Sequence, residues 1–357
     1  MPTANLSCVY FYISGGCNLS CRHCWITPDS AAHDMDTAGV RHALHQCKDA
    51  GVSIIKLTGG EPFLRKDIFE IFDCMRDLDL TARVETNGTL ITPAFAERLA
   101  QYKIQHIGIS LDSTDAVFHD TFRGKAGAFD AALAGISALQ ENGFRPEVIA
   151  SIYSANVDEV EKLALFLDAH SISVLKLNPI MTMGRGEILQ DQERLLSIPE
   201  ILELERLICS ELQQKVRTRI ILDIPPAFKS LASLAAHDTW GTCGIRSIVG
   251  ILADGTISMC GVGRAVKGLV FGNIQCDSLK DVWEENKTLC FIREHLVERL
   301  EGVCGDCILK NICFGKCRAF AYYQTGSLTA PYEFCSQALA LGLFPQTRLT
   351  AVEKTLA

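Results

Sequence analysis

Residues 16–25 of the chain read GCNLSCRHCW and place Cys17, Cys21 and Cys24 in the spacing C-x3-C-x2-C. Three thiolates this close along a chain can wrap one corner of a cubane cluster, each holding one iron, whereas a [4Fe–4S] cluster usually takes four. No fourth cysteine lies nearby in the sequence, so one iron would stay open to a small molecule. A zinc site or three unrelated thiols is the alternative, although zinc usually takes four ligands.

This loop, including the aromatic Trp25 after the third cysteine, resembles the signature of the radical S-adenosylmethionine (SAM) superfamily. The resemblance implies that the open iron binds SAM through its amine and carboxylate. One electron then breaks the S–C5′ bond and gives methionine and a 5′-deoxyadenosyl radical, which takes a hydrogen atom from an unactivated carbon. The cofactor carries this chemistry, while the protein fixes the geometry and keeps water away.

The first half of the chain alternates six times between strand-like and helix-like segments. Strands are expected at 9–13, 53–57, 83–86, 106–111, 147–152 and 174–177, and helices at 37–50, 68–78, 93–101, 129–141 and 157–169. Six such units predict a parallel sheet with covering helices. This α/β pattern is consistent with the partial (β/α)6 barrel that the resemblance implies, in which chemistry gathers at the carboxyl ends of the strands.

The second expected strand is followed by Gly59, Gly60, Glu61 and Pro62. Two glycines let backbone approach a ligand closely, because they carry no side chain. Glu61 adds an acceptor for an ammonium group. A plain turn is the alternative for such a sequence. In this position the segment resembles the family's GGEP motif, which binds the methionine amine of SAM.

Polar residues also follow the third and fourth expected strands. Thr86 and Asn87 end the third, and the resemblance puts them beside the methionyl and ribose groups of SAM. Ser110 and Asp112 lie two apart on a strand, so they share a face. A hydroxyl and a carboxylate on one face suit a ribose diol. Arg123 offers a planar fork that matches a carboxylate; the resemblance implies the SAM carboxylate, and a surface salt bridge is the alternative.

A second cysteine array occupies the last third of the chain. Residues 248–252 and 256–259, joined by Asp254-Gly255, read as a β-hairpin that can bring Cys243 toward Cys260. A C-x2-C pair by itself favours half a zinc ribbon. The full array closely resembles the SPASM extension of radical SAM enzymes, in which two auxiliary [4Fe–4S] clusters occupy the domain. Its members are Cys243, Cys260, Cys304, Cys307, Cys313, Cys317 and Cys335.

By this resemblance, four cysteines hold one complete auxiliary cluster, and these are Cys304, Cys307, Cys313 and Cys335. Three others hold the second cluster, and these are Cys243, Cys260 and Cys317. Many relatives have a further cysteine shortly after the first of the array, and this chain does not. The second cluster is therefore expected to have an open iron or a ligand from elsewhere, with Cys276 and Cys290 as the nearest spare thiols. The remaining cysteines are expected to pack in the core; they are Cys8, Cys47, Cys74 and Cys209.

Composition agrees with a cytoplasmic enzyme. The chain has 357 residues and a net charge of −8, which argues against a nucleic-acid partner. No signal peptide and no apolar run of membrane-spanning length are visible. Sixteen cysteines without an export signal favour metal over disulfides. The expected organisation is a barrel over 1–190, a helical connecting region over 191–240, the SPASM domain over 241–340 and a tail over 341–357.

Three functions compete. SPASM proteins mostly modify ribosomally made peptides or proteins, so the resemblance favours a peptide maturase that forms a crosslink, oxidises a side chain or excises backbone. The alternatives are an anaerobic sulfatase-maturase-like or small-alcohol oxidase, and a non-catalytic electron carrier, against which the complete set of SAM motifs argues. The expected partners are a precursor peptide or protein and a flavodoxin- or ferredoxin-type electron donor. Because the first strand begins by about residue 9, a separate protein is expected to bind any leader.

Overall fold

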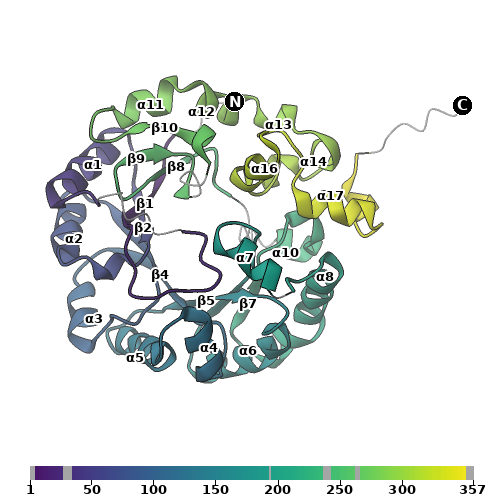
Figure 1. Ribbon diagram of the computed structural model, residues 1–357, viewed down its shortest axis with the longest axis horizontal. Helices are drawn as coiled ribbons and strands as arrows, with labels where there is room; N and C mark the ends of the chain where they lie inside the picture. Colours follow the sequence, from purple (N-terminus) through teal and green to yellow (C-terminus); the bar gives the residue numbers. More distant parts are fainter. Residues whose placement is uncertain (1–4, 27–33, 193, 236–242, 262–265, 351–357) are drawn as a thin grey trace, which may run out of the picture.

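A single ten-stranded sheet organises the molecule, in the order β10-β9-β8-β1-β2-β3-β4-β5-β6-β7. The computed structural model describes residues 5–26, 34–192, 194–235, 243–261 and 266–350. Strands β1 to β7 are all parallel to their neighbours, and most of the helices that follow them lie outside the curved sheet (Figure 1). The predicted α/β fold, a partial barrel followed by a small cysteine-rich region, is confirmed.

The expected elements are present, with bounds that differ by no more than about three residues, as is usual for boundaries. The parallel strands are β1 (Cys8–Ser14), β2 (Ile54–Gly59), β3 (Thr81–Thr86), β4 (Ile104–Ser110), β5 (Glu147–Ile152), β6 (Val174–Pro179) and β7 (Arg219–Leu222). The helices of this part are α1 (Thr37–Asp49), α2 (Ile68–Asp77), α3 (Pro93–Leu99), α4 (Ala116–Arg123), α5 (Ala128–Glu141), α6 (Val160–Ala169), α7 (Arg185–Gln192), α8 (Ile198–Leu207), α9 (Gln213–Lys215) and α10 (Leu231–Ala235).

Helix α4 was not expected from the sequence, and it carries Arg123 at its last position. Asp115 caps its first turn by accepting hydrogen bonds from the backbone N–H groups of Val117 and Phe118. Gly124 ends it in the left-handed conformation. An N-cap aspartate and a terminal glycine are the usual signals of a short helix. The helix therefore fixes where the Arg123 side chain begins.

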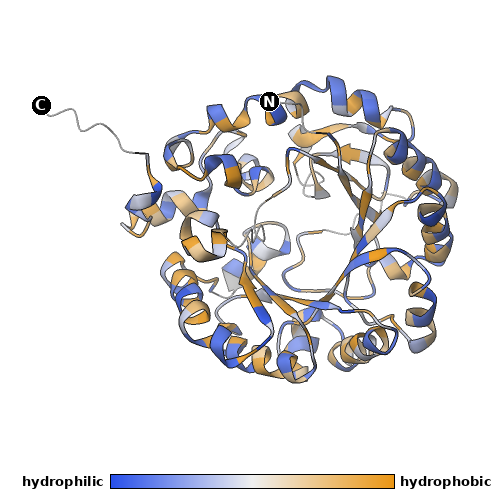
Figure 2. Cartoon of the chain, turned by 180° about the vertical axis from the view of Figure 1, so that it is seen from behind, coloured by the Kyte–Doolittle hydropathy of each residue, from blue (hydrophilic) through white to orange (hydrophobic). Residues whose placement is uncertain are grey.

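Strand residues alternate between the helical layer and the inside of the barrel. On β1, Val9, Phe11 and Ile13 are fully buried against the helices. Figure 2 shows the matching pattern on the helices, whose hydrophobic sides face the sheet and whose hydrophilic sides face outward. The intervening strand positions, such as Tyr10 and Lys56, line the inside and are only half-buried. The barrel thus has an apolar outer layer and a more polar inner wall.

The C-terminal region, residues 243–350, extends the same sheet. Its elements are β8 (Ile248–Ile251), β9 (Thr256–Ser258), β10 (Val270–Asn273), α11 (Leu279–Glu285), α12 (Lys287–Glu294), α13 (Leu296–Arg299), α14 (Gly302–Asp306), α15 (Lys310–Cys313), α16 (Arg318–Thr325) and α17 (Glu333–Ala340). Strand β8 pairs in parallel with β1, and β9 folds back on β8 as the predicted hairpin. At the other end of the sheet, the connecting region supplies β7 as well as helices.

The helices of the C-terminal region lie between the two ends of the sheet. In Figure 1, α14, α16 and α17 fill the sector between α13 and α8. An ion pair of 2.6 Å between Lys316 Nζ and Asp223 Oδ1 joins this region to the residue that follows β7. The two ends of the sheet, β10 and β7, do not pair with each other. Helices of the cysteine-rich region lie in the gap between them.

Three of the four cysteines that were expected to pack are buried, namely Cys8, Cys47 and Cys74. The prediction for Cys209 is wrong, because its side chain is exposed. It lies in a π-helical turn, Ile208–Leu212, whose buried residues are the first and the last. Across the described part of the chain, no helix has the length and apolar character that a membrane crossing requires.

We expect Gln46 of α1 to contribute to holding the C-terminal region on the barrel. Its Nε2 donates to the carbonyl of Ile274 at 3.0 Å, and its Oε1 accepts from the Leu279 N–H at 2.8 Å. Gln46→Ala should lower the free energy of unfolding by about 2 kcal/mol, since each net hydrogen bond is worth about 1 kcal/mol. Anaerobic urea unfolding measures this, with the exposed neighbour His45→Ala as the control. Equal stability of the two variants would contradict the assignment.

Candidate active site

The cysteine loop leaves the carboxyl end of β1 and packs directly on the loop that follows β2. The Gly60 N–H donates to the Ser14 carbonyl at 2.7 Å, and the Glu61 N–H donates to the Gly16 carbonyl at 2.8 Å. Gly59 has φ of +131°, and a Cβ there would overlap the Ser14 backbone. A Cβ on Gly60 would overlap the carbonyl of Gly16. The two glycines were expected to admit a ligand; here they admit the cysteine loop itself.

Glu61 is completely buried and ties the ends of β2 and β3 together. Its Oε1 accepts from the hydroxyl of Thr86 at 2.6 Å and from the N–H of Phe63 at 3.0 Å. Its Oε2 accepts from the N–H of Asn87 at 2.8 Å. Burial raises the pKa of the carboxyl to about 6, and the three hydrogen bonds oppose that shift. The carboxylate thus accepts hydrogen bonds from three groups of the protein itself. Its contact with the amine of SAM stays a prediction.

Asn87 connects the third strand end to the cysteine loop. Its Nδ2 donates to Asn18 Oδ1 at 2.9 Å and lies 3.9 Å from Cys17 Sγ. Its Oδ1 accepts from the N–H and the hydroxyl of Thr89, at 2.9 and 2.7 Å. Asn18 completes the ring by donating to Thr89 Oγ1 at 2.8 Å. This network orients the first cysteine, and Asn18 and Thr89 were not singled out from the sequence.

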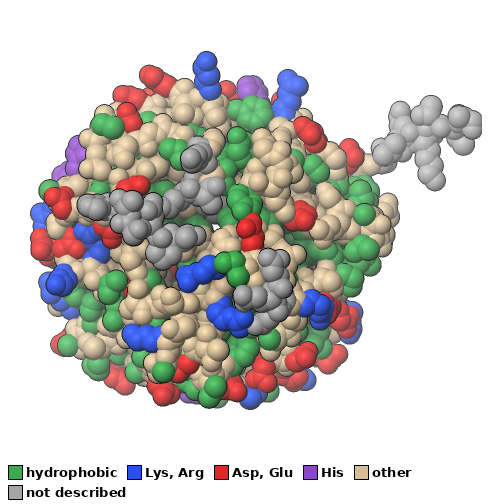
Figure 3. Space-filling model, in the orientation of Figure 1, with side chains coloured by type: hydrophobic (Ala, Val, Ile, Leu, Met, Phe, Trp, Pro, Cys, Tyr) green, Lys and Arg blue, Asp and Glu red, His purple; other side chains and the backbone are tan. Residues whose placement is uncertain are grey.

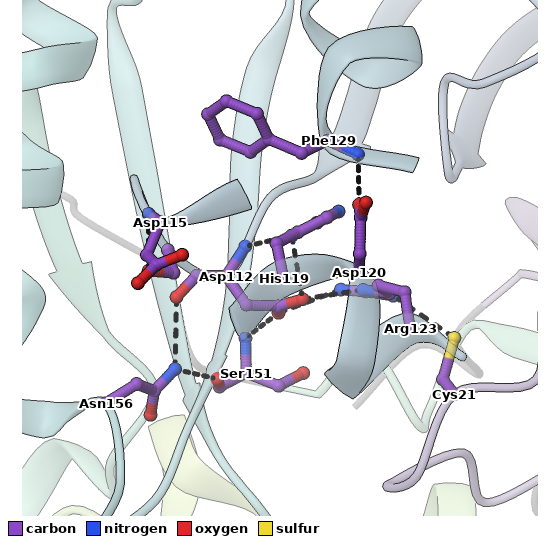
Figure 4. Close-up of polar contacts among 10 residues, drawn as sticks. Cys21, Asp112, Asp115, His119, Asp120, Arg123, Phe129, Ser151 and Asn156 are labelled. Carbon is purple, nitrogen blue, oxygen red and sulfur yellow. Dashed lines mark hydrogen bonds and ion pairs between the residues drawn. The ribbon is translucent and has the colours of Figure 1, made fainter. Parts of the chain in front are cut away.

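Asp112 and Arg123 form a buried two-pronged ion pair (Figure 4). Arg123 Nε donates to Oδ2 at 2.6 Å, and Arg123 Nη2 donates to Oδ1 at 2.8 Å. The Ser151 N–H adds a third bond to Oδ1 at 2.9 Å. The remaining Nη1 of Arg123 reaches Cys21 Sγ at 3.8 Å. The pair therefore links the end of β4, strand β5 and helix α4 to the second cysteine.

The charges of this pair hold both groups ionised. Burial alone would raise the pKa of Asp112, but Arg123 outweighs it and keeps that pKa below its ordinary value. Burial likewise lowers the pKa of His119, whose Nδ1 accepts from the Asp112 N–H at 3.2 Å and is therefore unprotonated. Strand β4 ends at Ser110, so the alternation expected to put Ser110 and Asp112 on one face stops there. Ser110 is half-buried on the inner side, and the contacts of Ser110 and Asp112 with the ribose of SAM stay predictions.

The third cysteine is held from the start of α7 and from β1. The Arg185 N–H donates to the Cys24 carbonyl at 3.1 Å. Gly184 packs so closely on Trp25 that a Cβ would overlap its backbone. The Trp25 ring meets the Tyr12 ring edge-on, with centroids 5.8 Å apart. The cysteine loop is thus contacted from the ends of β1, β2 and β3, from helix α4 and from the start of α7. These contacts place all three thiols at the carboxyl edge of the barrel.

The four cysteines expected to hold one auxiliary cluster line a single apolar pocket, together with Leu309 and Phe344. They are Cys304, Cys307, Cys313 and Cys335. The N–H groups of Tyr332 and Leu309 donate to Cys304 and Cys307 sulfurs at 3.3 and 3.4 Å. A hydrogen bond with Cys335 keeps the pKa of Cys304 below its ordinary value. Hydrogen-bonded thiols in an apolar pocket suit an iron–sulfur cluster, whose potential depends on such bonds.

Neither array presents ligands for a single ion, because no group of three or more His, Cys, Asp or Glu among the described residues is arranged to hold one. The four pocket thiols surround a space without converging on a point. A multi-iron cluster uses this arrangement, since each thiolate binds a different iron.

The three cysteines expected on the second auxiliary cluster lie around the inner side of β1. Cys243 and Cys317 are close enough for the charge of one to raise the pKa of the other, and burial raises the pKa of Cys243 to about 12. Cys260 lies beside the phenol of Tyr12, against which Gly261 packs. Cys276 and Cys290 bond locally instead, to the carbonyls of Asn273 and Glu284 at 3.6 and 3.1 Å. The expectation of an open iron or of a fourth ligand from elsewhere stays a prediction.

Comparison with known proteins agrees with this geometry. Residues 11–167 match the family described as the Radical SAM superfamily, and residues 243–308 match the iron–sulfur cluster-binding domain SPASM. The AdoMet-dependent heme synthase of Methanosarcina barkeri is 31% identical, over 90% of this chain and 94% of that protein. The PqqA peptide cyclase of Ruegeria pomeroyi is 26% identical, over 90% of this chain and 85% of that protein.

A solved structure shares the fold. Streptococcus suis SuiB, crystallised with its precursor peptide SuiA, superposes with a TM-score of 0.74 at 20% identity. The superposition covers 93% of this chain and 76% of SuiB. The partial barrel and the C-terminal region therefore occur together, in the same arrangement, in a protein of known structure.

Breaking the Asp112–Arg123 pair should destabilise the protein strongly. Asp112→Asn leaves a buried guanidinium without its counter-charge, a change that typically costs about 3–5 kcal/mol. We expect a clear fall in the midpoint of anaerobic thermal unfolding. The matched control is Glu203→Gln, which removes the carboxylate of a fully exposed pair with Arg206 and should leave the midpoint unchanged. If the two variants have the same unfolding midpoint, the buried pair contributes no more to stability than the exposed pair does, and the prediction is wrong.

Proposed function

Because the chain belongs to the radical SAM superfamily and carries a SPASM domain, we propose that this enzyme is a maturase of a ribosomally made peptide. When bound, SAM and the iron–sulfur cluster supply a carbon radical that removes a hydrogen atom from a substrate. The product is a crosslinked, oxidised or excised peptide. The chain's own contribution is to hold the cysteine loop rigidly, to bind the peptide inside the barrel and to exclude water.

The polar inner wall of the barrel is the observation that carries this proposal. Its half-buried side chains include Lys56, Glu85, His106, Glu147 and Lys176, from five successive strands. Small-molecule sites are mostly apolar with a few polar groups. A peptide presents an N–H and a C=O at every residue, and each must find a partner when it is buried. A wall rich in charged and hydrogen-bonding groups therefore suits a peptide better than a flat apolar molecule.

The proposal assigns the cofactors to named residues. Cys17, Cys21 and Cys24 would hold the SAM-binding [4Fe–4S] cluster, next to Asn87 and Arg123, whose N–H groups approach the sulfurs. Two auxiliary [4Fe–4S] clusters would occupy the C-terminal region on the cysteines already described. Gly59 to Pro62, Thr86, Asn87, Ser110 and Trp25 surround the position proposed for SAM.

The proposal also fixes the setting. Reductive cleavage of SAM consumes one electron, so we propose a flavodoxin- or ferredoxin-type protein as the electron donor. We also propose a cytoplasmic location, where free thiols stay reduced. All sixteen cysteines are free in the structure. In this proposal the inner wall of the barrel binds the substrate peptide. A separate protein binds the leader of that peptide and delivers the peptide to the enzyme.

Heme synthesis is the second candidate, and the 31% identity to the Methanosarcina barkeri heme synthase favours it. Expression of this chain in a strain of that organism lacking its own synthase distinguishes the two. Restored heme would favour the second candidate over the first.

The test of the peptide proposal uses anaerobically reconstituted protein, SAM, a strong reductant and the short peptide encoded beside the gene. We expect 5′-deoxyadenosine together with a change in peptide mass, such as the loss of two hydrogen atoms for one crosslink or oxidation. A sulfatase-derived peptide with a reactive serine or cysteine serves as the comparison. The triple variant Cys17→Ala, Cys21→Ala, Cys24→Ala should give neither product. Modification of the sulfatase peptide alone would overturn the proposal.

Metal content tests the cofactor assignment separately. The reconstituted protein should hold three clusters, or about 12 irons if each is [4Fe–4S]. The same triple variant should lose about a third of that iron and keep the remainder. Replacing Cys304 and Cys307 by alanine should remove a different third and leave SAM cleavage possible. Zinc in place of iron would rule out the assignment.

A further inference from the structure

Each of three carboxylates on the inner side of the barrel already has a basic partner. Glu85 meets Lys56 at 2.5 Å, and Glu147 meets His106 at 3.4 Å. Asp223 meets Lys316 at 2.6 Å. Glu85 and Asp223 nevertheless keep 34% and 28% of their side-chain surface exposed, although strands surround them. The inside of the barrel is therefore open to small groups, and Figure 3 shows an opening near the centre of this face.

Lys176 is a cation of this wall whose side chain forms no hydrogen bond and no ion pair with the described residues, although its backbone pairs with β5 and β7. It lies on β6 between Leu175 and Leu177, which are fully buried on the helical side, so its own side chain faces inward. Its charge contributes to lowering the pKa of Glu85 and of Asp223 without contact with either. The ammonium group of Lys176 therefore faces the inside of the barrel without a carboxylate bound directly to it among the described residues.

Asn178 provides a second unsatisfied group on the same strand face. It follows Lys176 by two residues, so both side chains point the same way. Its Oδ1 is buried and has no hydrogen-bond partner in the part of the chain that the structure describes. Buried acceptors of this kind are rare in native proteins, because an unmade hydrogen bond is costly. An unpaired donor and an unpaired acceptor side by side indicate a ligand that supplies both complements.

The register of the sheet places these groups close to the proposed SAM position. Lys176 pairs with Ile149 on β5, and Ile149 pairs with Ser110 on β4. Two strand spacings amount to about 10 Å. A lysine side chain spans much of that distance. A substrate group held by Lys176 therefore lies within reach of the hydrogen-abstracting radical.

We propose that Lys176 and Asn178 form a subsite for an acidic residue of the substrate peptide. The ammonium of Lys176 pairs with the side-chain carboxylate, and Asn178 Oδ1 accepts a backbone N–H of the same residue. The subsite rests on the proposed peptide function and specifies its substrate class. It anchors an aspartate or glutamate beside the atom that reacts.

The test uses two small probes with the SAM-loaded holoenzyme. They are N-acetyl-glutamate N-methylamide, which carries the carboxylate and the N–H groups, and its neutral isostere, N-acetyl-glutamine N-methylamide. Equilibrium dialysis of the labelled probes gives both affinities. We expect the wild type to prefer the glutamate probe by at least about tenfold, which corresponds to about 1.4 kcal/mol and to the strength of a charge-assisted hydrogen bond. Lys176→Met should abolish the preference, and Lys176→Arg should retain much of it.

The control is Lys215→Met, an exposed lysine that pairs with Glu161 on the outer surface and should keep the preference. Equal binding of the two probes by the wild type, or an undiminished preference in Lys176→Met, would overturn the subsite. A loss of SAM affinity in Lys176→Met would assign the ammonium to the cofactor instead. These readouts need no turnover. If the probes behave as expected and no peptide is modified, the peptide function fails while the carboxylate subsite stands.

Discussion

The close backbone contact between Gly59-Gly60 and the cysteine loop is the constraint on which the rest of the site depends. Strands β1 and β2 pair regularly until Tyr12, and an irregularity then brings Ser14 opposite Gly59. A side chain at either glycine would push the cysteine loop away from the barrel. Once the two loops touch, Glu61 is buried beneath them, and its carboxylate accepts hydrogen bonds from the end of β3 and from the N–H of Phe63. One steric requirement thus fixes the ends of three strands.

Buried charge then completes the positioning. An ion pair such as Asp112–Arg123 contributes little net stability compared with apolar packing, but it is specific, because breaking it leaves an uncompensated charge. The pair joins β4, β5 and α4, and its remaining N–H group approaches Cys21. Backbone bonds from Ser20 and Arg22 to the carbonyls of Arg123 and Phe122 hold the same stretch of the loop. These contacts fix the part of the loop that carries Cys21, and a rigid site needs its ligands held in this way.

The sequence predicts the order of strands and helices well, because alternating apolar patterns and glycine signals are local properties. Its spacing also identifies the cysteine loop, and the family resemblance groups the four pocket cysteines and singles out the Gly-Gly-Glu-Pro segment. It does not predict the partners of side chains. Spacing puts Glu61, Asp112 and Arg123 at the correct edge of the barrel, but only the fold shows that they bind protein groups. The sequence also does not single out Lys176, because the absence of an ion-pair partner can be seen only once the fold has placed the surrounding carboxylates.

Tyr12 of β1 contacts both cysteine arrays and so fixes the distance between them. Tyr12 meets Trp25, the residue after the third loop cysteine, and packs on Gly261, the residue after Cys260. A Cβ at Gly261 would overlap the phenol ring, so the hairpin can approach Tyr12 only because this residue is a glycine. Strand β8 pairs with the opposite side of β1 from β2 and brings that hairpin into place. Both arrays are therefore built around one strand of one continuous sheet. A movement of the C-terminal region relative to the cysteine loop would have to break the pairing of β8 with β1 and the contact of Gly261 with Tyr12. The spacing between the arrays is therefore a property of the sheet.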